Sequence, residues 1–61
     1  MKFDLRQARS YAGLSQKEIA NKLDLAKLTY QKYEAGERKM RVDKAEKFSK
    51  VVGIPMNQII F

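Results

Sequence analysis

Residues 14–36 of the chain read LSQKEIANKLDLAKLTYQKYEAG. Their apolar residues follow the spacing of one amphipathic helix, but the pattern stops at Asp24 and Leu25 and then begins again. A chain of 61 residues has little material for a hydrophobic core, so an interruption in its best helix calls for a reason. We expect the interruption to direct the second half of the stretch, residues 27–35, toward something outside the protein.

The size and composition of the chain limit what it can do. A domain of about 60 residues hides only roughly 60% of the surface that its unfolded chain exposes, which leaves little room for a buried catalytic cleft. The sequence contains no Cys and no His, and so lacks thiolate chemistry, the commonest metal ligand and the usual acid–base group at neutral pH. We therefore expect one domain, residues 1–61, that is not an enzyme and has no metal site and no cofactor.

The charge of the chain is strongly positive. Thirteen Lys and Arg residues oppose seven Asp and Glu residues, which gives a formal net charge of +6 and a pI near 9.8. Such a charge favours polyanions, meaning nucleic acid or an anionic membrane surface, although it also keeps a small protein soluble. Residues 1–30 carry six positive and three negative side chains, and residues 31–61 carry seven and four. A basic surface must therefore be assembled by folding.

No segment of the sequence points to a membrane. The first ten residues, MKFDLRQARS, lack the apolar core of a targeting signal. No stretch approaches the roughly 20 apolar residues of a membrane-spanning helix. We expect a cytoplasmic protein without a membrane partner.

Apolar periodicity and capping residues predict helices throughout the chain and no strand. Ser15 and Glu18 fit a capping box, in which the hydroxyl accepts one free N–H and the carboxylate another. Gly13 and Gly36 stand where a left-handed residue follows a helix, and Gly53 ends the helix expected before it. The fold class that follows is all-α, a compact bundle of five short helices, expected at residues 3–12, 15–23, 26–35, 41–52 and 56–60.

The inward faces of these helices predict the core. Tyr30 and Tyr33 define the buried stripe of the helix at residues 26–35, so Leu28 is expected to be exposed. The other residues expected inside follow the same rule on their own segments: Leu5, Ala8, Ala12, Ile19, Ala20, Leu23, Val42, Ala45, Phe48, Val52, Ile54 and Ile59. On the outer face of the helix at residues 41–52, the lysines at positions 44, 47 and 50 are expected to pair with the neighbouring carboxylates at positions 43 and 46.

Residues 14–36 resemble the helix-turn-helix of the Cro/cI-type (XRE-like) phage repressors, with the pattern L-S/T-Q-x-E-L-A-x-x-L-G-V-S-x-x-T-I-S-x-[IWY]-E-x-G. Outside this stretch, Arg9 matches the arginine of the family's first helix, and KAEKFSKVVGIPMNQII resembles its C-terminal end. The resemblance covers nearly the whole chain. It rests on Leu14, Ser15, Gln16, Glu18, Ala20, Leu23, Thr29, Tyr33, Glu34 and Gly36, with Ile19, Leu25 and Tyr30 as apolar equivalents.

The resemblance implies a lambda repressor-like domain that binds double-stranded DNA sequence-specifically. Such a domain regulates transcription as a repressor, of phage or prophage type and associated with the nucleoid. The recognition helix, residues 26–35, would lie in the major groove with its first residues at base edges. Base contacts are then expected from Lys27, Leu28, Thr29, Gln31 and Lys32. Phosphate contacts are expected from Gln16, Lys17, Arg38, Lys39 and Arg41.

The resemblance also implies a structural ion pair between Arg9 and Glu34, which would keep the carboxylate from repelling DNA. Three departures from the family pattern weaken the connections between helices. Asp24 replaces the glycine of the turn, Ala26 replaces the Ser or Thr that caps the recognition helix, and Met40 replaces a proline before the next helix.

Residues 51–61, VVGIPMNQIIF, carry more apolar side chains than one short helix turns inward. Ile60 and Phe61, together with Val51, are expected to form an exposed apolar patch, which marks an interface. We expect a two-fold homodimer through this patch and the end of the helix at residues 41–52, weak in solution and strengthened on the operator. The alternative is that a further C-terminal domain covers the patch.

Two other functions fit the same fold. One is the DNA-binding antitoxin of a toxin–antitoxin pair, which a co-purifying toxin would reveal. The other is a protein-interaction module, which would bind DNA weakly and without salt dependence. The basic face of residues 27–32 argues against this last function.

Overall fold

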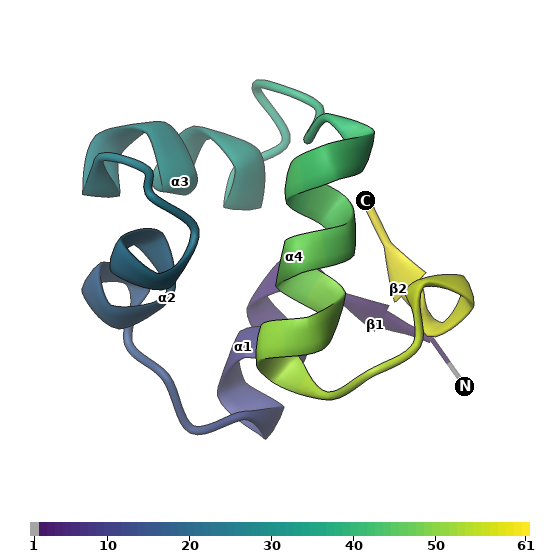
Figure 1. Cartoon of the computed structure of the whole chain (residues 1–61). Helices are drawn as coiled ribbons and strands as arrows, with labels where there is room; N and C mark the ends of the chain where they lie inside the picture. Colours follow the sequence, from purple (N-terminus) through teal and green to yellow (C-terminus); the bar gives the residue numbers. More distant parts are fainter. Residues whose placement is uncertain (1) are drawn as a thin grey trace.

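The computed structural model describes residues 2–61. Two very short strands, four α-helices and one 3-10 turn follow one another along this part of the chain. In order they are β1 (Phe3–Asp4), α1 (Leu5–Tyr11), α2 (Gln16–Lys22), α3 (Lys27–Glu34), α4 (Val42–Val52), η1 (Met56–Gln58) and β2 (Ile59–Ile60). In Figure 1, α2 and α3 lie on one side of α4 and the two strands on the other, beside the ends of the chain.

The prediction of a fifth helix at residues 56–60 is wrong. Met56–Gln58 make a single 3-10 turn, and β2 pairs in parallel with β1, with Phe3 opposite Ile59 and Asp4 opposite Ile60. The prediction that the chain contains no strand is also wrong, because β1 and β2 form a two-stranded sheet. Pro55 is extended, with φ −57° and ψ 145°, and the β-branched pair that follows η1 suits a strand.

The first helix begins two residues later than expected because Asp4 caps it. The Asp4 carboxylate accepts the N–H of Gln7 at 2.8 Å, and the Gln7 side chain accepts the N–H of Asp4 at 3.0 Å. The capping box predicted at α2 is confirmed, with Ser15 and Glu18 exchanging bonds of 3.0 and 2.9 Å. The left-handed backbone predicted for Gly13 and Gly36 is confirmed, with φ +72° and +79°, and α4 ends before Gly53 as predicted.

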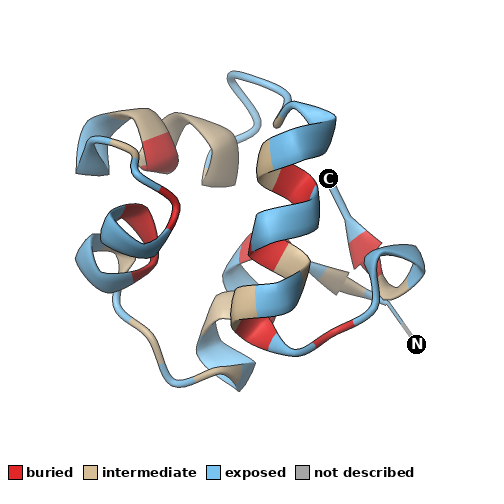
Figure 2. Ribbon diagram, viewed as in Figure 1, coloured by how far each residue is buried: buried red, intermediate tan, exposed pale blue. Residues whose placement is uncertain are grey.

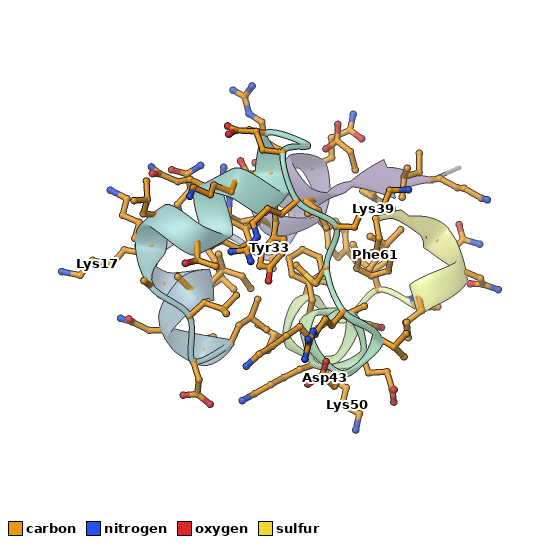
Figure 3. The ribbon with its side chains drawn as sticks, turned by 90° about the horizontal axis from the view of Figure 1, so that it is seen from above. Lys17, Tyr33, Lys39, Asp43, Lys50 and Phe61 are labelled. Carbon is orange, nitrogen blue, oxygen red and sulfur yellow. The ribbon has the colours of Figure 1, made fainter. Side chains whose placement is uncertain are left out.

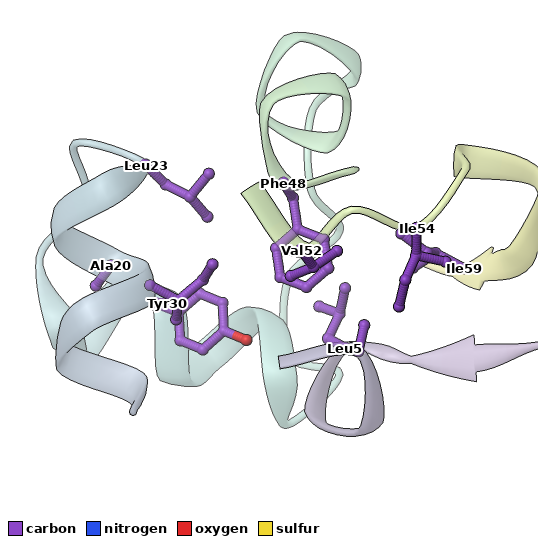
Figure 4. Packing of buried hydrophobic residues seen from close by; sticks show 10 residues of the cluster. Leu5, Ala20, Leu23, Tyr30, Phe48, Val52, Ile54 and Ile59 are labelled. Carbon is purple, nitrogen blue, oxygen red and sulfur yellow. The ribbon is translucent and has the colours of Figure 1, made fainter. Parts of the chain in front are cut away.

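The core lies where all four helices and β2 meet (Figure 2). Figure 4 shows Phe48 and Val52 of α4 facing Leu5 of α1 and the ring of Tyr30. Most residues predicted inside are buried, whereas Ala12 and Tyr33 are only half-buried. The full buried set is Leu5, Ala8, Ile19, Ala20, Leu23, Tyr30, Ala45, Phe48, Val52, Ile54 and Ile59.

Val42 contradicts its prediction, because 71% of this residue is exposed. It is the first residue of α4, and Met40, two residues earlier, packs against the core instead. Met40 therefore packs against the core, where the periodic pattern placed Val42.

Candidate nucleic-acid interface

A sharp turn separates α2 from α3. Asp24 has φ +56°, the single positive φ at a residue other than glycine in the described chain. The N–H of Leu25 binds the carbonyl of Ala20 at 2.9 Å, which closes the end of α2. Ala26 precedes α3 and makes no side-chain hydrogen bond to it. As the sequence indicated, the turn lacks both a glycine and a side-chain cap.

The outer face of α3 is open to solvent at its N-terminal end. Lys27 and Leu28 are exposed, and Leu28 retains 64% of its accessible surface, as predicted. Thr29 and Lys32 are half-buried. Lys27 and Leu28 at the start of the helix offer one cationic and one apolar contact to a ligand, and Lys32 adds a second cation in the last turn.

Gln31 of α3 is turned back onto the protein. Its amide donates to Oε1 of Gln16 at 3.0 Å, and the amide of Gln16 in turn donates to Oε1 of Glu34 at 3.2 Å. Each of these glutamine amides keeps a second hydrogen that the bond does not use. The first residue of α2 and the middle of α3 are therefore linked to the ion pair beneath them.

Arg9 and Glu34 lie together, as the resemblance implied. Nε of Arg9 is 2.8 Å from Oε2 of Glu34 and Nη2 is 3.2 Å from Oε1, while Nη1 donates to the carbonyl of Leu14 at 2.9 Å. Their side chains are only 15% and 8% exposed. Burial by itself raises the pKa of Glu34, but the hydrogen bonds and the charge of Arg9 outweigh it and leave the pKa below its usual value. The carboxylate stays ionised.

Tyr30 lies beneath this pair, and sequence reasoning treated it only as a core residue. Its hydroxyl is buried without a hydrogen-bond partner among residues 2–61. Burial, and then the neighbouring Glu34, raise the pKa of the hydroxyl, so it remains protonated. Its neighbours come from two helices, Glu34 four residues later on α3 and Arg9 on α1.

The other cationic residues proposed for phosphates lie on exposed segments. Lys17 projects outward from α2, and Lys39 lies in the loop between α3 and α4 (Figure 3). Arg38 and Arg41 are exposed in the same loop. None of these four side chains makes an ion pair with another residue that the structure describes. They are available to an external anion.

The lysines of α4 do not pair with the carboxylates of their own helix as expected. Nζ of Lys44 donates to the carbonyl of Leu23 at 2.6 Å, and Nζ of Lys47 lies 3.0 Å from Oδ2 of Asp24. Both reach across to the turn between α2 and α3. Because these partners lie more than 20 residues away, only the packing of α4 against α2 brings them together.

The C-terminal residues divide between the core and the surface. Ile54 and Ile59 are buried as predicted, and Ile60 is 58% exposed. The ring of Phe61 packs edge-on against Phe48, with centroids 6.1 Å apart, so this side chain is partly engaged within the protein. No helix in residues 2–61 is long and apolar enough to cross a membrane.

Comparisons with known proteins agree with this geometry. Residues 5–59 match the model of the helix-turn-helix family. The chain is 32% identical to the transcriptional repressor RstR of the cryptic phage CTXphi from Vibrio cholerae. The aligned 56 residues cover 92% of this chain. The chain spans half of the length of that repressor. No solved structure matches the chain significantly. The protein belongs to the helix-turn-helix family.

Proposed function

We propose that the chain is a sequence-specific DNA-binding domain of a transcriptional repressor, with α3 as its recognition helix. The observation that carries the proposal is the asymmetry of α3. Its inner face is fixed by Tyr30 and Glu34, and its outer face presents Lys27 and Leu28 to solvent. The family match and the likeness to a phage repressor support the same function.

The dimensions and chemistry of the major groove suit this face. The groove is about 12 Å wide and admits one helix. Lys27 and Lys32 offer donors that fit the O6 and N7 acceptors of guanine, and Leu28 fits the methyl group of thymine. Thr29 lies between Lys27 and Lys32 along α3. The Oε1 atom of Gln31 accepts no bond within the described chain, so it remains free for an amino group on a base.

Phosphate contacts would flank the recognition helix on both sides. Lys17 on α2 and Arg38, Lys39 and Arg41 in the loop after α3 are exposed cations. Gln16 would add its second amide hydrogen while Glu34 holds the first. Contacts of this kind set orientation and affinity without reading sequence.

We further propose that the protein acts as a two-fold homodimer in the bacterial cytoplasm, at the nucleoid, and without a cofactor. The exposed Ile60 and the half-engaged Phe61 that follows it support an interface there. Val51, which was expected in the same patch, is half-buried and packs against the core. Repressors of this class bind half-sites about 34 Å apart on one face of the duplex. A pair of such domains would therefore select a palindromic operator.

Selection of bound duplexes from random DNA tests the function. We expect a short motif to be enriched, repeated with two-fold symmetry at a spacing of about ten base pairs. A variant carrying Lys27→Ala and Lys32→Ala keeps every proposed phosphate contact and serves as the control, which should enrich a weaker or shorter motif. Recovery of random sequences by the wild type would contradict the proposal.

Sedimentation on a duplex with two half-sites tests the dimer. We expect wild type to bind the two sites cooperatively and Ile60→Asp to bind them independently, since a buried carboxylate opposes the interface. Ile60→Leu retains the apolar side chain and should behave as wild type. Independent binding by wild type would exclude the dimer and leave the DNA-binding proposal untouched.

A further inference from the structure

The two lysines of α4 that reach the turn have a role that DNA contact does not explain. Lys44 binds the carbonyl of Leu23 at 2.6 Å, and Lys47 binds the carboxylate of Asp24 at 3.0 Å. Lysines three residues apart lie on one face of a helix, and here both end on consecutive residues of the turn. We call these two contacts the lysine clamp.

The turn is weak in the places that the clamp reaches. Asp24 adopts a left-handed backbone, which aspartate tolerates less well than glycine does. Ala26 leaves the first N–H groups of α3 without a side-chain cap. The carbonyl of Leu23 follows the last residue of α2 and has no donor within that helix. Lys44 supplies one, and a cation is favourable at a helix C-terminus.

We infer that Lys44 and Lys47 are positioning residues that set the angle between α2 and α3, and with it the register in which α3 meets base edges. The inference rests on the proposed DNA-binding function. Lys44 is half-buried and makes the shorter bond, so it has the larger effect. The Lys47–Asp24 pair is 45% and 78% exposed and is weakened by solvent. Neither lysine has to touch DNA.

A purely electrostatic role would leave a different signature. Loss of a lysine that contacts phosphate weakens binding to every duplex alike, whereas loss of alignment weakens binding mainly to the preferred one. Lys50 lies on the same helix, is exposed, and makes no ion pair within the described residues. Lys50→Met is therefore the matched control, with the same change in charge and no effect on the turn.

The test compares Lys44→Met with Lys50→Met on the duplex that wild type selects and on a random duplex. For Lys44→Met we expect the ratio of the two affinities to fall at least roughly fivefold, the size of one misplaced base contact. Lys50→Met should keep the wild-type ratio, and Lys44→Arg should restore it because arginine retains a charged donor. Equal ratios in the two methionine variants would overturn the inference.

A measurement without DNA separates the clamp from the proposed function. Residual dipolar couplings report the angle between α2 and α3, and circular dichroism reports whether each variant is folded. A changed angle in folded Lys44→Met supports the clamp, whatever wild type binds. If wild type prefers no duplex, that result refutes the proposed function and leaves the clamp standing. If Lys44→Met does not fold, Lys47→Ala should shift the angle in the same direction by less. An unchanged angle in the folded variant overturns the clamp.

Discussion

The two ends of α3 are held in different ways. At the C-terminal end, Glu34 accepts two bonds from Arg9 and one from Gln16, and this site is largely shielded from water. At the N-terminal end, Ala26 offers no cap, and the turn before it is held by partly exposed lysines. Rigid anchoring therefore lies away from the end proposed to meet base edges. The reading end depends on weaker contacts.

The largest expected effect comes from breaking the rigid end. Arg9→Ala leaves the Glu34 carboxylate without its partner and should lower the free energy of unfolding by about 3–5 kcal/mol. Urea denaturation followed by circular dichroism measures this loss. A domain of this size has a total stability on the order of 5 kcal/mol, so the variant should keep at most about 2 kcal/mol and be partly unfolded.

Removing both charges supplies the control for that loss. The double variant Arg9→Met with Glu34→Leu should recover much of the stability, because no unpaired charge remains in the shielded site. The two single variants complete a thermodynamic cycle whose coupling energy belongs to the pair. A negligible coupling energy would contradict the assignment of the pair as the anchor of α3.

On the outer face of α3, the expected losses concern binding to DNA. Lys27→Ala or Lys32→Ala should cost about 1–3 kcal/mol on the preferred duplex and relax the preference at one or two base pairs. Fluorescence anisotropy on the preferred and random duplexes measures both. Lys39→Ala is the matched control: it should weaken both duplexes alike and reduce the slope of log affinity against log salt by about one. Equal losses on both duplexes for Lys27→Ala would make it a phosphate contact.

Acid should weaken the Arg9–Glu34 pair that holds the C-terminal end of α3 and so lower the stability of the fold. The pKa of Glu34 lies below its ordinary value of 4.5 because the bonds from Arg9 outweigh the effect of burial. The folded state then binds the proton less readily than the unfolded state. The resulting stability is present above the unfolded pKa and is lost as the pH falls through the lowered folded pKa. We expect the free energy of unfolding to decrease below about pH 5.

The doubly substituted chain, Arg9→Met with Glu34→Leu, serves as the comparison for this titration. Its stability should fall less steeply with acid than that of wild type. Some slope should remain, because hydrogen bonds also lower the pKa values of the exposed carboxylates of Glu18 and Asp24. Identical slopes in both proteins would show that Glu34 is not the main titrating group.

The contrast between the two ends also explains what the sequence could predict. The capping box of α2 joins residues three apart, so periodicity and residue type were enough to find it. Arg9 and Glu34 lie 25 residues apart, and only the resemblance to a family indicated that they meet. The clamp contact from Lys44 ends on a backbone carbonyl. Every residue carries such a carbonyl, so the sequence cannot show which one the lysine binds.

The errors in the prediction have a similar cause. β1 and β2 contain two residues each and pair across nearly the whole chain, so neither shows the alternation that identifies a strand. Val42 follows the helical period, yet it lies at the first turn of α4 and is exposed, while Met40 packs against the core. Periodicity locates the faces of a helix well and its ends poorly.

The smallest expected effect is at the turn itself, and it measures how weakly this end is held. Left-handed backbone costs an ordinary residue on the order of 1 kcal/mol or more, and glycine avoids that cost. The exposed ion pair between Asp24 and Lys47 is weakened by solvent and contributes little. Lys44 still binds the carbonyl of Leu23 after Asp24→Gly, so we expect this variant to raise the midpoint of thermal unfolding slightly. Asp24→Asn tolerates the backbone but loses the charge, and should leave the midpoint nearly unchanged. A clear decrease in both variants would mean that the exposed pair anchors the turn strongly, and the two ends of α3 would then be held with similar strength.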